Sequence, residues 1–156
     1  MDIEAFQIIG IAVRTTNENN QSGIDIPQLW QTFIAENIAD QIPNKMDSTI
    51  YCLYTDYEKD HTKPYTAILG CRVESLTHVP KNMLGKRVAG GTYASYVAKG
   101  NLADGVVFNE WIKIWNSDLP RAFTSDFEIY GEKAMSPENA EVEICIATLI
   151  LDPNED

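Results

Sequence analysis

Glu128 is the residue of this chain whose position most needs a chemical explanation. It lies in "SDFEIYG", residues 125 to 131, where strand alternation puts Phe127 and Ile129 on one face and Glu128 and Tyr130 on the other. Strands disfavour glutamate, and a buried carboxylate without a partner is costly. Glu128 therefore faces water, forms an ion pair, or occupies a pocket where a ligand can meet it.

Two of these three environments of Glu128 involve no ligand. The strand face of Glu128 can be open to solvent, or the carboxylate can pair with Arg72, Arg121 or Lys133. The alternation alone does not choose between these readings and a pocket, because both faces of the strand carry bulky residues.

The aromatic residues make the pocket reading worth developing. The chain has three tryptophans and seven tyrosines, and several of the tyrosines fall on expected strands: Tyr51, Tyr54, Tyr93, Tyr96 and Tyr130. A carboxylate ringed by tyrosine and tryptophan is a box for an organic cation or a flat polar aromatic compound. A desolvated cation–π contact contributes roughly 2 kcal/mol, so a few rings and one carboxylate suffice for micromolar binding.

The elements that must position these residues follow one order twice. The sequence predicts strand, helix, strand, strand in each half of the chain: strand 5–14, helix 25–40, strands 49–57 and 65–75, then strand 87–98, helix 102–117, strands 125–132 and 141–150. The first helix is expected to begin with a capping box, with Asp25 as the N-cap, Gln28 three residues later and Pro27 in the first turn.

The two expected helices carry the same apolar pattern. "IPQLWQTFI" and "VFNEWIKIW" each place a tryptophan, Trp30 and Trp111, at the same step of an i, i+4, i+7, i+8 stripe. Such a stripe is usually core packing, but its recurrence points to a duplication with a crevice between the halves.

These patterns predict an α+β fold of one domain, residues 1–156, with pseudo-repeats at about 5–76 and 86–150. Short loops join consecutive strands in each half, which disfavours a doubly wound parallel sheet. We expect a tandem pair of strand–helix–strand–strand units in an antiparallel sheet, with both helices on one face and a ligand cleft between them.

Composition and charge exclude several classes of protein. The 156 residues are 44% hydrophobic and 22% charged, which is an ordinary globular composition. The formal net charge of −11 disfavours direct binding to nucleic acid or anionic membranes. The N-terminus carries acids where a signal peptide needs basic residues, so a cytoplasmic location is expected.

No cofactor or metal is expected. His61 and His78 stand alone in predicted loops and are expected at the surface. The cysteines, Cys52, Cys71 and Cys145, lie far apart on expected strands and are interpreted as buried hydrophobic residues. The sequence has no nucleotide-binding glycine motif, and the glycine pair in "AGGTYASY" is expected to form a turn or bulge.

The ordered motifs resemble a known family. "IPQLWQTFI", "YTDYEKDHTKPYTAILGCRV", "GGTYASYVAKG", "VVFNEWIKIW" and "DFEIYG" occur in the order seen in the GyrI-like small-molecule-binding domain, the effector-binding domain of AraC-type and MerR-type transcription activators. The resemblance covers about Phe6 to Leu149. It implies the tandem fold and the cleft described above, and a standalone domain, since no helix-turn-helix precedes Phe6.

The resemblance also implies ligand-binding residues. The family's cleft glutamate on a late strand matches Glu128, and its helix tryptophan matches Trp111. Tyr51, Tyr93 and Trp30 are expected in the pocket wall from aromatic position only, and Tyr130 from its place on the strand face of Glu128. The leading hypothesis is a binding protein for amphipathic cationic or aromatic compounds, and catalysis is expected less than binding.

Two other functions stay open. Some relatives hydrolyse reactive electrophilic ring compounds with the same glutamate, which would make Glu128 a general base. Others modulate gyrase, so a protein partner or a separate transcription factor is the third hypothesis.

Overall fold

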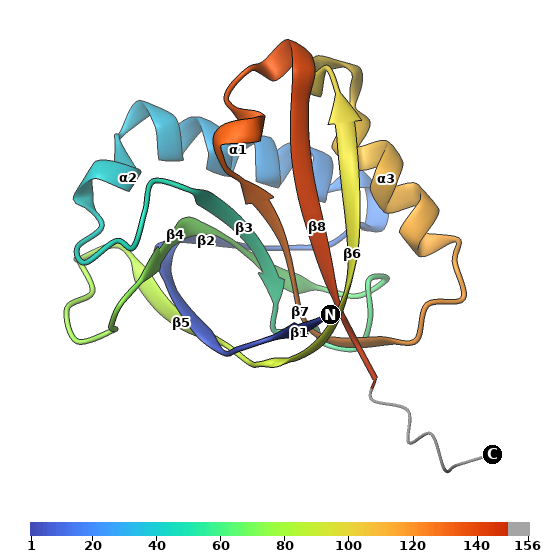
Figure 1. The fold of residues 1–156 in the computed structure, drawn as a ribbon, viewed down its shortest axis with the longest axis horizontal. Coiled ribbons are helices and arrows are strands. Elements are labelled where there is room, and N and C mark those ends of the chain that lie inside the picture. Colours follow the sequence, from blue (N-terminus) through green and yellow to red (C-terminus); the bar gives the residue numbers. More distant parts are fainter. Residues whose placement is uncertain (150–156) are drawn as a thin grey trace.

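The computed structural model describes residues 1–149, which form an antiparallel sheet of eight strands with its helices on one face (Figure 1). The elements in chain order are β1 (Asp2–Ile3), β2 (Phe6–Thr15), η1 (Glu18–Asn20), α1 (Ser22–Ala35), α2 (Ile38–Gln41), β3 (Ile50–Thr55), β4 (Tyr65–Val73), β5 (Leu84–Val88), β6 (Gly91–Gly100), η2 (Leu102–Asp104), α3 (Val106–Trp115), β7 (Arg121–Tyr130), η3 (Glu132–Ala134), η4 (Pro137–Asn139) and β8 (Ala140–Thr148).

The order of elements confirms the tandem arrangement. β2, α1, β3 and β4 make the first strand–helix–strand–strand unit, and β6, α3, β7 and β8 make the second. In each unit the last two strands pair as an antiparallel hairpin. The units join where β3 pairs with β7 in the middle of the sheet. The α+β fold with two main helices on one face is therefore as predicted, whereas the division into pseudo-repeats within one domain stays a prediction.

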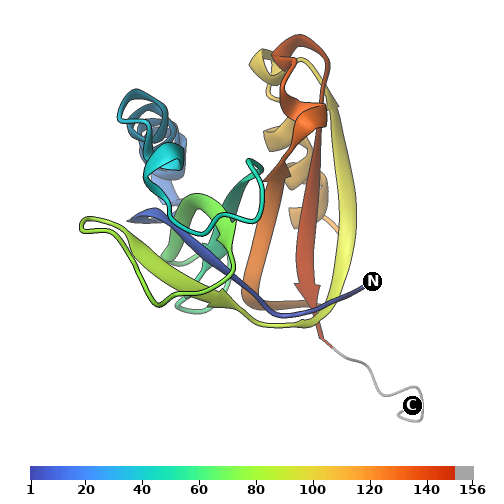
Figure 2. The same ribbon diagram turned by 60° about the vertical axis from the view of Figure 1, so that its left-hand side comes forward.

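The sheet curls because the chain links its two edges. The strand order is β1-β6-β8-β7-β3-β4-β2-β5. β1, at one edge, leads into β2, the second strand from the other edge, and β5, at that other edge, leads into β6 beside β1, each through a very short connection. The short connections hold the edges near each other, and the sheet becomes a half-barrel (Figures 1 and 2).

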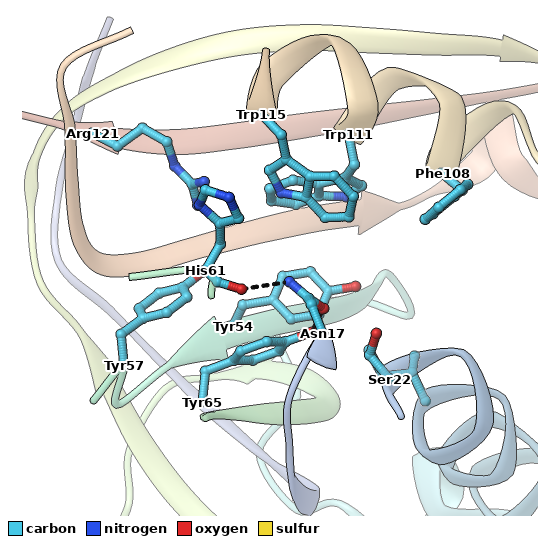
Figure 3. Close-up of a pocket in the computed structure, with 11 residues that line it drawn as sticks. Asn17, Ser22, Tyr54, Tyr57, His61, Tyr65, Phe108, Trp111, Trp115 and Arg121 are labelled. Atoms are coloured by element: carbon cyan, nitrogen blue, oxygen red, sulfur yellow. Dashed lines mark hydrogen bonds between the residues drawn. The ribbon is translucent and has the colours of Figure 1, made fainter. Parts of the chain in front are cut away.

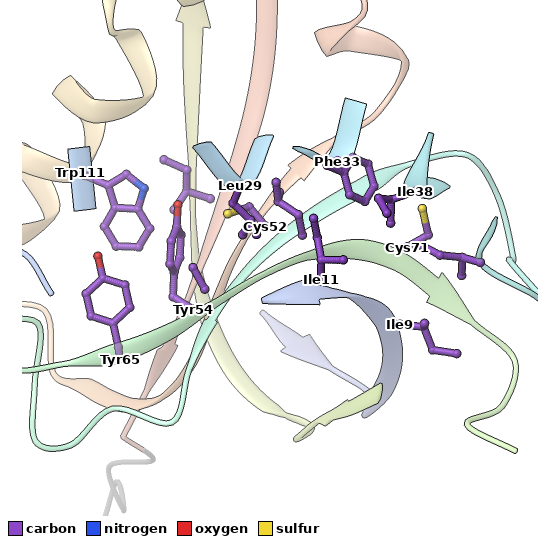
Figure 4. Packing of buried hydrophobic residues seen from close by; sticks show 14 of the residues in the cluster. Ile9, Ile11, Leu29, Phe33, Ile38, Cys52, Tyr54, Tyr65, Cys71 and Trp111 are labelled. Atoms are coloured by element: carbon purple, nitrogen blue, oxygen red, sulfur yellow. The ribbon is translucent and has the colours of Figure 1, made fainter. Parts of the chain in front are cut away.

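Each face of the sheet packs its own apolar cluster. The cluster on the helix side contains Leu29 and Phe33 of α1 and Trp111 and Ile114 of α3, which lie against strand residues (Figure 4). Only strand residues form the opposite cluster, which is centred on Phe127. No helix covers this second cluster in the described part of the chain, so the curl of the sheet itself must exclude water from it.

Alternation along the strands decides which residues go to which cluster. On β3, Cys52 and Tyr54 lie on the helix side, and Tyr51 and Leu53 lie on the opposite side. On β7, Phe127 is in the opposite cluster, and Glu128 points toward the helices. The predicted faces of β7 are thus confirmed, and all three cysteines are free and buried.

The predicted start of the first helix is wrong. α1 begins at Ser22, three residues before Asp25, so Asp25 lies in its first turn and is not the N-cap. Its Oδ1 accepts a hydrogen bond from the Gln21 side chain, at 2.9 Å, and does not cap the backbone. The 3₁₀ turn η1 reverses the chain through Asn19 and Asn20, both at positive φ, and this places the helix start earlier than propensity indicated.

Other boundaries differ by smaller amounts. The predicted helix 25–40 is two helices, because Asn37 adopts a left-handed conformation and breaks the chain between α1 and α2. The predicted strand at 87–98 divides into β5 and β6 at a glycine-containing turn. Residue 150, the predicted end of the last strand, lies outside the described residues, as do 151–156. No helix within residues 1–149 combines the length and apolar character needed to span a bilayer.

The close approach of β2 and β4 in the curled sheet makes Gly10 sensitive to substitution. Gly10 of β2 pairs with Gly70 of β4, and a Cβ at Gly10 would meet the Leu69 carbonyl oxygen and lie 2.6 Å from the Gly70 Cα. Both obstacles are backbone, so they cannot move aside cheaply. We expect Gly10→Ala to lower the free energy of unfolding by about 1–3 kcal/mol in urea denaturation followed by circular dichroism.

Gly91→Ala is the matched control, because a Cβ at Gly91 meets no atom within 4 Å. It should change the free energy of unfolding by no more than about 0.5 kcal/mol. Equal stability of the two variants would contradict the close approach of β2 and β4.

Candidate functional site

A cleft of about 450 Å³ lies between α1 and α3, with β3 and β7 as its floor. Each helix contributes one wall. The lining residues are Asn20, Ser22, Gly23, Ile26, Pro27 and Trp30 near and on α1, Leu102, Gly105, Val107, Phe108 and Trp111 near and on α3, and Tyr54, Glu128 and Tyr130 on the floor. This is the cleft between the helices that the sequence predicts.

Glu128 stands on the floor of the cleft and is 2% exposed. Its Oε2 accepts hydrogen bonds from the Tyr54 hydroxyl at 2.9 Å and from Trp111 Nε1 at 2.7 Å. Its Oε1 accepts one from the Tyr130 hydroxyl at 2.6 Å. All three donors are neutral, so hydrogen bonds satisfy the carboxylate without compensating its charge.

The ion-pair readings of Glu128 are wrong in this structure. Arg121 pairs with Asp126 at 2.8 Å and Lys133 approaches Glu141 at 3.7 Å, while the Arg72 guanidinium lies over the Phe6 ring. The solvent-exposed reading is also wrong, since Glu128 is buried.

Burial and hydrogen bonding act on the pKa of Glu128 in opposite directions. Desolvation is the larger effect and raises the pKa above its ordinary value, while the bonds from Tyr130, Trp111 and Tyr54 lower it. The result is a carboxyl group with a raised pKa that a nearby positive charge would return to its ionised form.

Aromatic rings surround the carboxylate at right angles to each other. Trp30 of α1 meets Tyr130 edge to face, with ring centroids 4.8 Å apart. Trp111 of α3 meets Tyr54 in the same way at 5.5 Å. The two tryptophans that share a helical step in the sequence thus face the same cleft, one from each helix.

The cleft widens at one end. A cavity of about 600 Å³ shares Trp30, Val107 and Tyr130 with the central cleft and continues toward η3. Ile34, which the apolar stripe of α1 predicts to be buried, is 66% exposed and lines this wider end.

The cleft narrows at the other end to a small cavity of about 90 Å³ (Figure 3). Tyr54, Trp111 and Phe108 belong to both this cavity and the central cleft. Its other walls include Tyr57, Tyr65, His61, Trp115 and Arg121. His61 is half-buried and stacks on Trp115 with centroids 5.8 Å apart, so the expectation of a surface histidine is wrong for His61 and right for the exposed His78.

An irregularity in β7 shapes this narrow end. The register with β8 shifts between Arg121 and Asp126, and Phe123 within the shift has φ 55°. A bulge of this kind redirects side chains, and a positive φ is strained for a bulky residue. The Phe123 ring consequently lies 4.4 Å from the centre of the Arg121 guanidinium.

Two predicted wall residues do not line the cleft. Tyr51 and Tyr93 belong to the cluster on the opposite face of the sheet, where both rings pack near Phe127. The Tyr93 hydroxyl donates to the Ala89 carbonyl oxygen at 2.7 Å. The prediction is wrong because both residues alternate to the face that the curl encloses. Glu128, Trp111, Trp30 and Tyr130 do lie together, as predicted.

Sequence reasoning missed several lining residues. Tyr54 could have been predicted from the sequence. Strand alternation puts it on the other face of β3 from Tyr51, and this is the sheet face that carries Glu128. Tyr57, His61 and Arg121 could not have been predicted in this way, because a loop and a bulge position them. No group of three or more His, Cys, Asp or Glu side chains in residues 1–149 is arranged to hold a metal ion.

Several known proteins are similar to this chain in fold, and some of them also in sequence. An integron cassette protein from the mobile metagenome of Vibrio cholerae is 33% identical, with a TM-score of 0.75 over 96% of this chain and 94% of its own. The structure of SAV2435 bound to tetraphenylphosphonium has a TM-score of 0.76 at 16% identity, over 94% of this chain and 90% of that one.

A curated relative is more distant in sequence than the cassette protein. YobU of Bacillus subtilis (strain 168), which is thought to be a transcriptional regulator, is 27% identical over 151 residues, which are 94% of this chain and 93% of YobU. The family model of the integron-associated effector-binding proteins (Cass2) matches residues 1–148.

These matches confirm the resemblance to GyrI-like effector-binding domains. That resemblance implied the tandem fold and the cleft. The family model spans nearly all of the described chain, and the cassette protein covers it at 33% identity. The chain belongs to the family of integron-associated effector-binding proteins.

Proposed function

We propose that this protein binds amphipathic cationic or aromatic small molecules in the cleft between α1 and α3, with Glu128 as the counter-charge. The observation that carries the proposal is the buried carboxylate of Glu128, which three neutral donors hold and which no cation within residues 1–149 compensates. A buried charge of this kind is unfavourable in the empty protein and becomes favourable when a cation reaches it.

The surroundings of Glu128 suit such a ligand. A cleft of about 450 Å³ is in the size range of pockets for drug-sized molecules. Trp30 and Trp111 offer ring faces or edges from two sides, and cations are attracted to the faces of aromatic rings. The formal net charge of −11 attracts cations over longer distances.

Two comparisons support the proposal. Membership in an effector-binding family supports binding of a small molecule. SAV2435, which shares the fold, was solved with tetraphenylphosphonium, an aromatic cation. We propose a cytoplasmic location, because a cleft of this kind would intercept compounds that have entered the cell.

Hydrolysis is the weaker alternative. A general base needs a free lone pair directed at a water molecule. Glu128 already accepts three hydrogen bonds, two of them on Oε2, so only Oε1 keeps a lone pair for water, and this favours holding a ligand over activating water. A role toward a protein partner would use the acidic surface and would not depend on Glu128.

Glu128→Gln tests the proposal directly. The substitution keeps the shape of the side chain and removes its charge, so the affinity for tetraphenylphosphonium should fall about tenfold to a hundredfold in isothermal titration calorimetry. Glu4→Gln, an exposed residue between β1 and β2, removes the same formal charge far from the cleft and should leave the affinity nearly unchanged.

Stability gives the second readout of Glu128→Gln. Because the pKa of Glu128 is raised in the fold, the stabilisation from its neutral form is present below its ordinary pKa and is lost as the pH rises through the folded value. Glutamine mimics the neutral form, so the melting temperature at pH 7 should be equal to that of the wild type or higher. A large decrease in melting temperature would contradict an uncompensated carboxylate.

The raised pKa of Glu128 also predicts a pH dependence of binding. A permanent cation favours the ionised carboxylate, so its affinity should decrease as the pH falls through the raised pKa, by up to about tenfold per pH unit, until it reaches the affinity of Glu128→Gln. Titration calorimetry between pH 4 and pH 8 measures this, and Glu128→Gln should remove the dependence. A flat profile in the wild type would contradict a role for the charge.

Tyr54→Phe shifts that profile in a known direction. The Tyr54 hydroxyl lowers the pKa of Glu128 by donating to Oε2, so its loss should move the midpoint of the pH profile upward. Tyr51→Phe on the same strand is the matched control, because Tyr51 lies on the opposite face, and its midpoint should not move. Equal shifts in both variants would place the effect outside the cleft.

A further inference from the structure

We propose that the narrow end of the cleft is a hydrogen-bonding subsite, where Arg121 donates to a neutral oxygen acceptor on the bound cation, such as an ester, amide or ketone carbonyl. The inference rests on the proposed function, because it assigns a second point of recognition to the same ligand.

Arg121 has donors that the fold does not use. Its side chain is 5% exposed, and Nη2 donates to Asp126 at 2.8 Å. Its Nε and Nη1 are buried and have no hydrogen-bond partner among the described residues. Buried donors are nearly always satisfied, so these N–H groups indicate a position where an acceptor from outside the chain belongs.

The cavity beside Arg121 fits a small polar group. It measures about 90 Å³, and a water molecule occupies about 30 Å³ of liquid. A carbonyl with its neighbouring atoms fits this space, whereas a bulky aromatic group belongs in the wider cleft. His61 Nδ1 is also buried and has no hydrogen-bond partner in the part of the chain that the structure describes, so a second polar atom is available at the subsite.

The charges around the subsite favour a neutral acceptor over an anion. Asp126 already compensates Arg121 and also accepts a bond from the Tyr57 hydroxyl at 2.6 Å. Burial and the Arg121 charge lower the pKa of His61, so His61 brings little positive charge at pH 7. Because Asp126 already pairs with Arg121, a ligand carboxylate would find no uncompensated positive charge at the subsite and would be repelled by Asp126.

The backbone near Arg121 is strained. The β7 bulge and the positive φ of Phe123 are both unfavourable in a regular strand, and such strain persists where the surrounding structure requires it. The strained conformation lets Phe123 cover one face of the Arg121 guanidinium and stack with His61, with ring centroids 6.2 Å apart. The bulge thus directs Arg121 and closes the subsite around it.

Trp111 connects the subsite to the carboxylate. Its Nε1 donates to Glu128, and the Arg121 guanidinium lies 5.7 Å from its ring. Figure 3 shows Arg121, His61 and the two indoles of α3 along one side of the cavity. A ligand against Trp111 is therefore within reach of both groups, with its cationic part toward Glu128 and its carbonyl toward Arg121.

Three triphenylphosphonium salts test the subsite by titration calorimetry. 4-Oxopentyl-triphenylphosphonium carries a ketone, 4-methylpent-4-enyl-triphenylphosphonium replaces the oxygen with a CH₂ group, and 3-carboxypropyl-triphenylphosphonium carries a carboxylate. We expect the wild type to bind the ketone about fivefold to tenfold more tightly than the alkene, and the carboxylate more weakly than the ketone.

Arg121→Lys keeps the positive charge beside Asp126 and removes the free guanidinium donors. It should bring the ratio of ketone affinity to alkene affinity down to about one, whatever its effect on the two affinities together. Arg87→Lys, an exposed arginine on β5, is the matched control and should retain the preference. Because Arg121→Lys can lose the fold, the Arg121 Nε–H resonance of the wild type is followed in parallel, and it should shift with the ketone and not with the alkene.

The outcomes separate the two proposals. Equal affinity of the wild type for ketone and alkene, a preference that persists in folded Arg121→Lys, or tightest binding of the carboxylate would overturn the neutral-acceptor subsite and leave Glu128 as the cation site. If none of the three phosphonium salts bound, the proposed function itself would fail.

Discussion

The buried carboxylate of Glu128 is the group around which the rest of the cleft is arranged. A charge in a medium of low dielectric constant needs hydrogen bonds from every side that is not solvent. Tyr54 supplies one from β3, Trp111 one from α3 and Tyr130 one from β7. The carboxylate therefore links a strand of the first unit to a helix and a strand of the second, at the junction where β3 pairs with β7.

The partners of Glu128 differ from those of the neighbouring buried carboxylate, Asp126, and the difference bears on function. Asp126 and Glu128 are both buried and lie two residues apart on β7. Asp126 has an arginine, a tyrosine hydroxyl and the Ala147 amide as partners, which is how proteins stabilise a permanent buried charge. Glu128 has hydroxyl and indole donors only. The cation that would complete it is missing from the described chain, as expected if a ligand supplies it.

Features that depend on a local sequence pattern could be predicted from the sequence, whereas features that depend on tertiary packing could not. Period-two alternation put Glu128 and Tyr130 on one strand face, where the structure has them, but only the family resemblance put Glu128 and Trp111 in a cleft. The repeated helical stripe indicated a crevice between the helices that carry Trp30 and Trp111. The same alternation puts Tyr51 on the enclosed face and its neighbour Tyr54 in the cleft, contrary to the prediction for Tyr51. Arg121 was beyond reach, because a bulge sets its direction and bulges depend on tertiary packing.

The sheet, more than contact between the helices, sets the width of the cleft. α1 and α3 each lie on their own part of the curled sheet and stand apart above its middle (Figure 2). Leu29 and Phe33 anchor α1, and Ile114 anchors α3, in the cluster on the helix side. The cleft between them is lined mostly by aliphatic and aromatic side chains, so apolar contact alone distinguishes little among aromatic compounds. Discrimination must then come from charge at Glu128 and from the hydrogen-bonding groups at the narrow end, which is why a few buried polar atoms matter more here than the many apolar contacts.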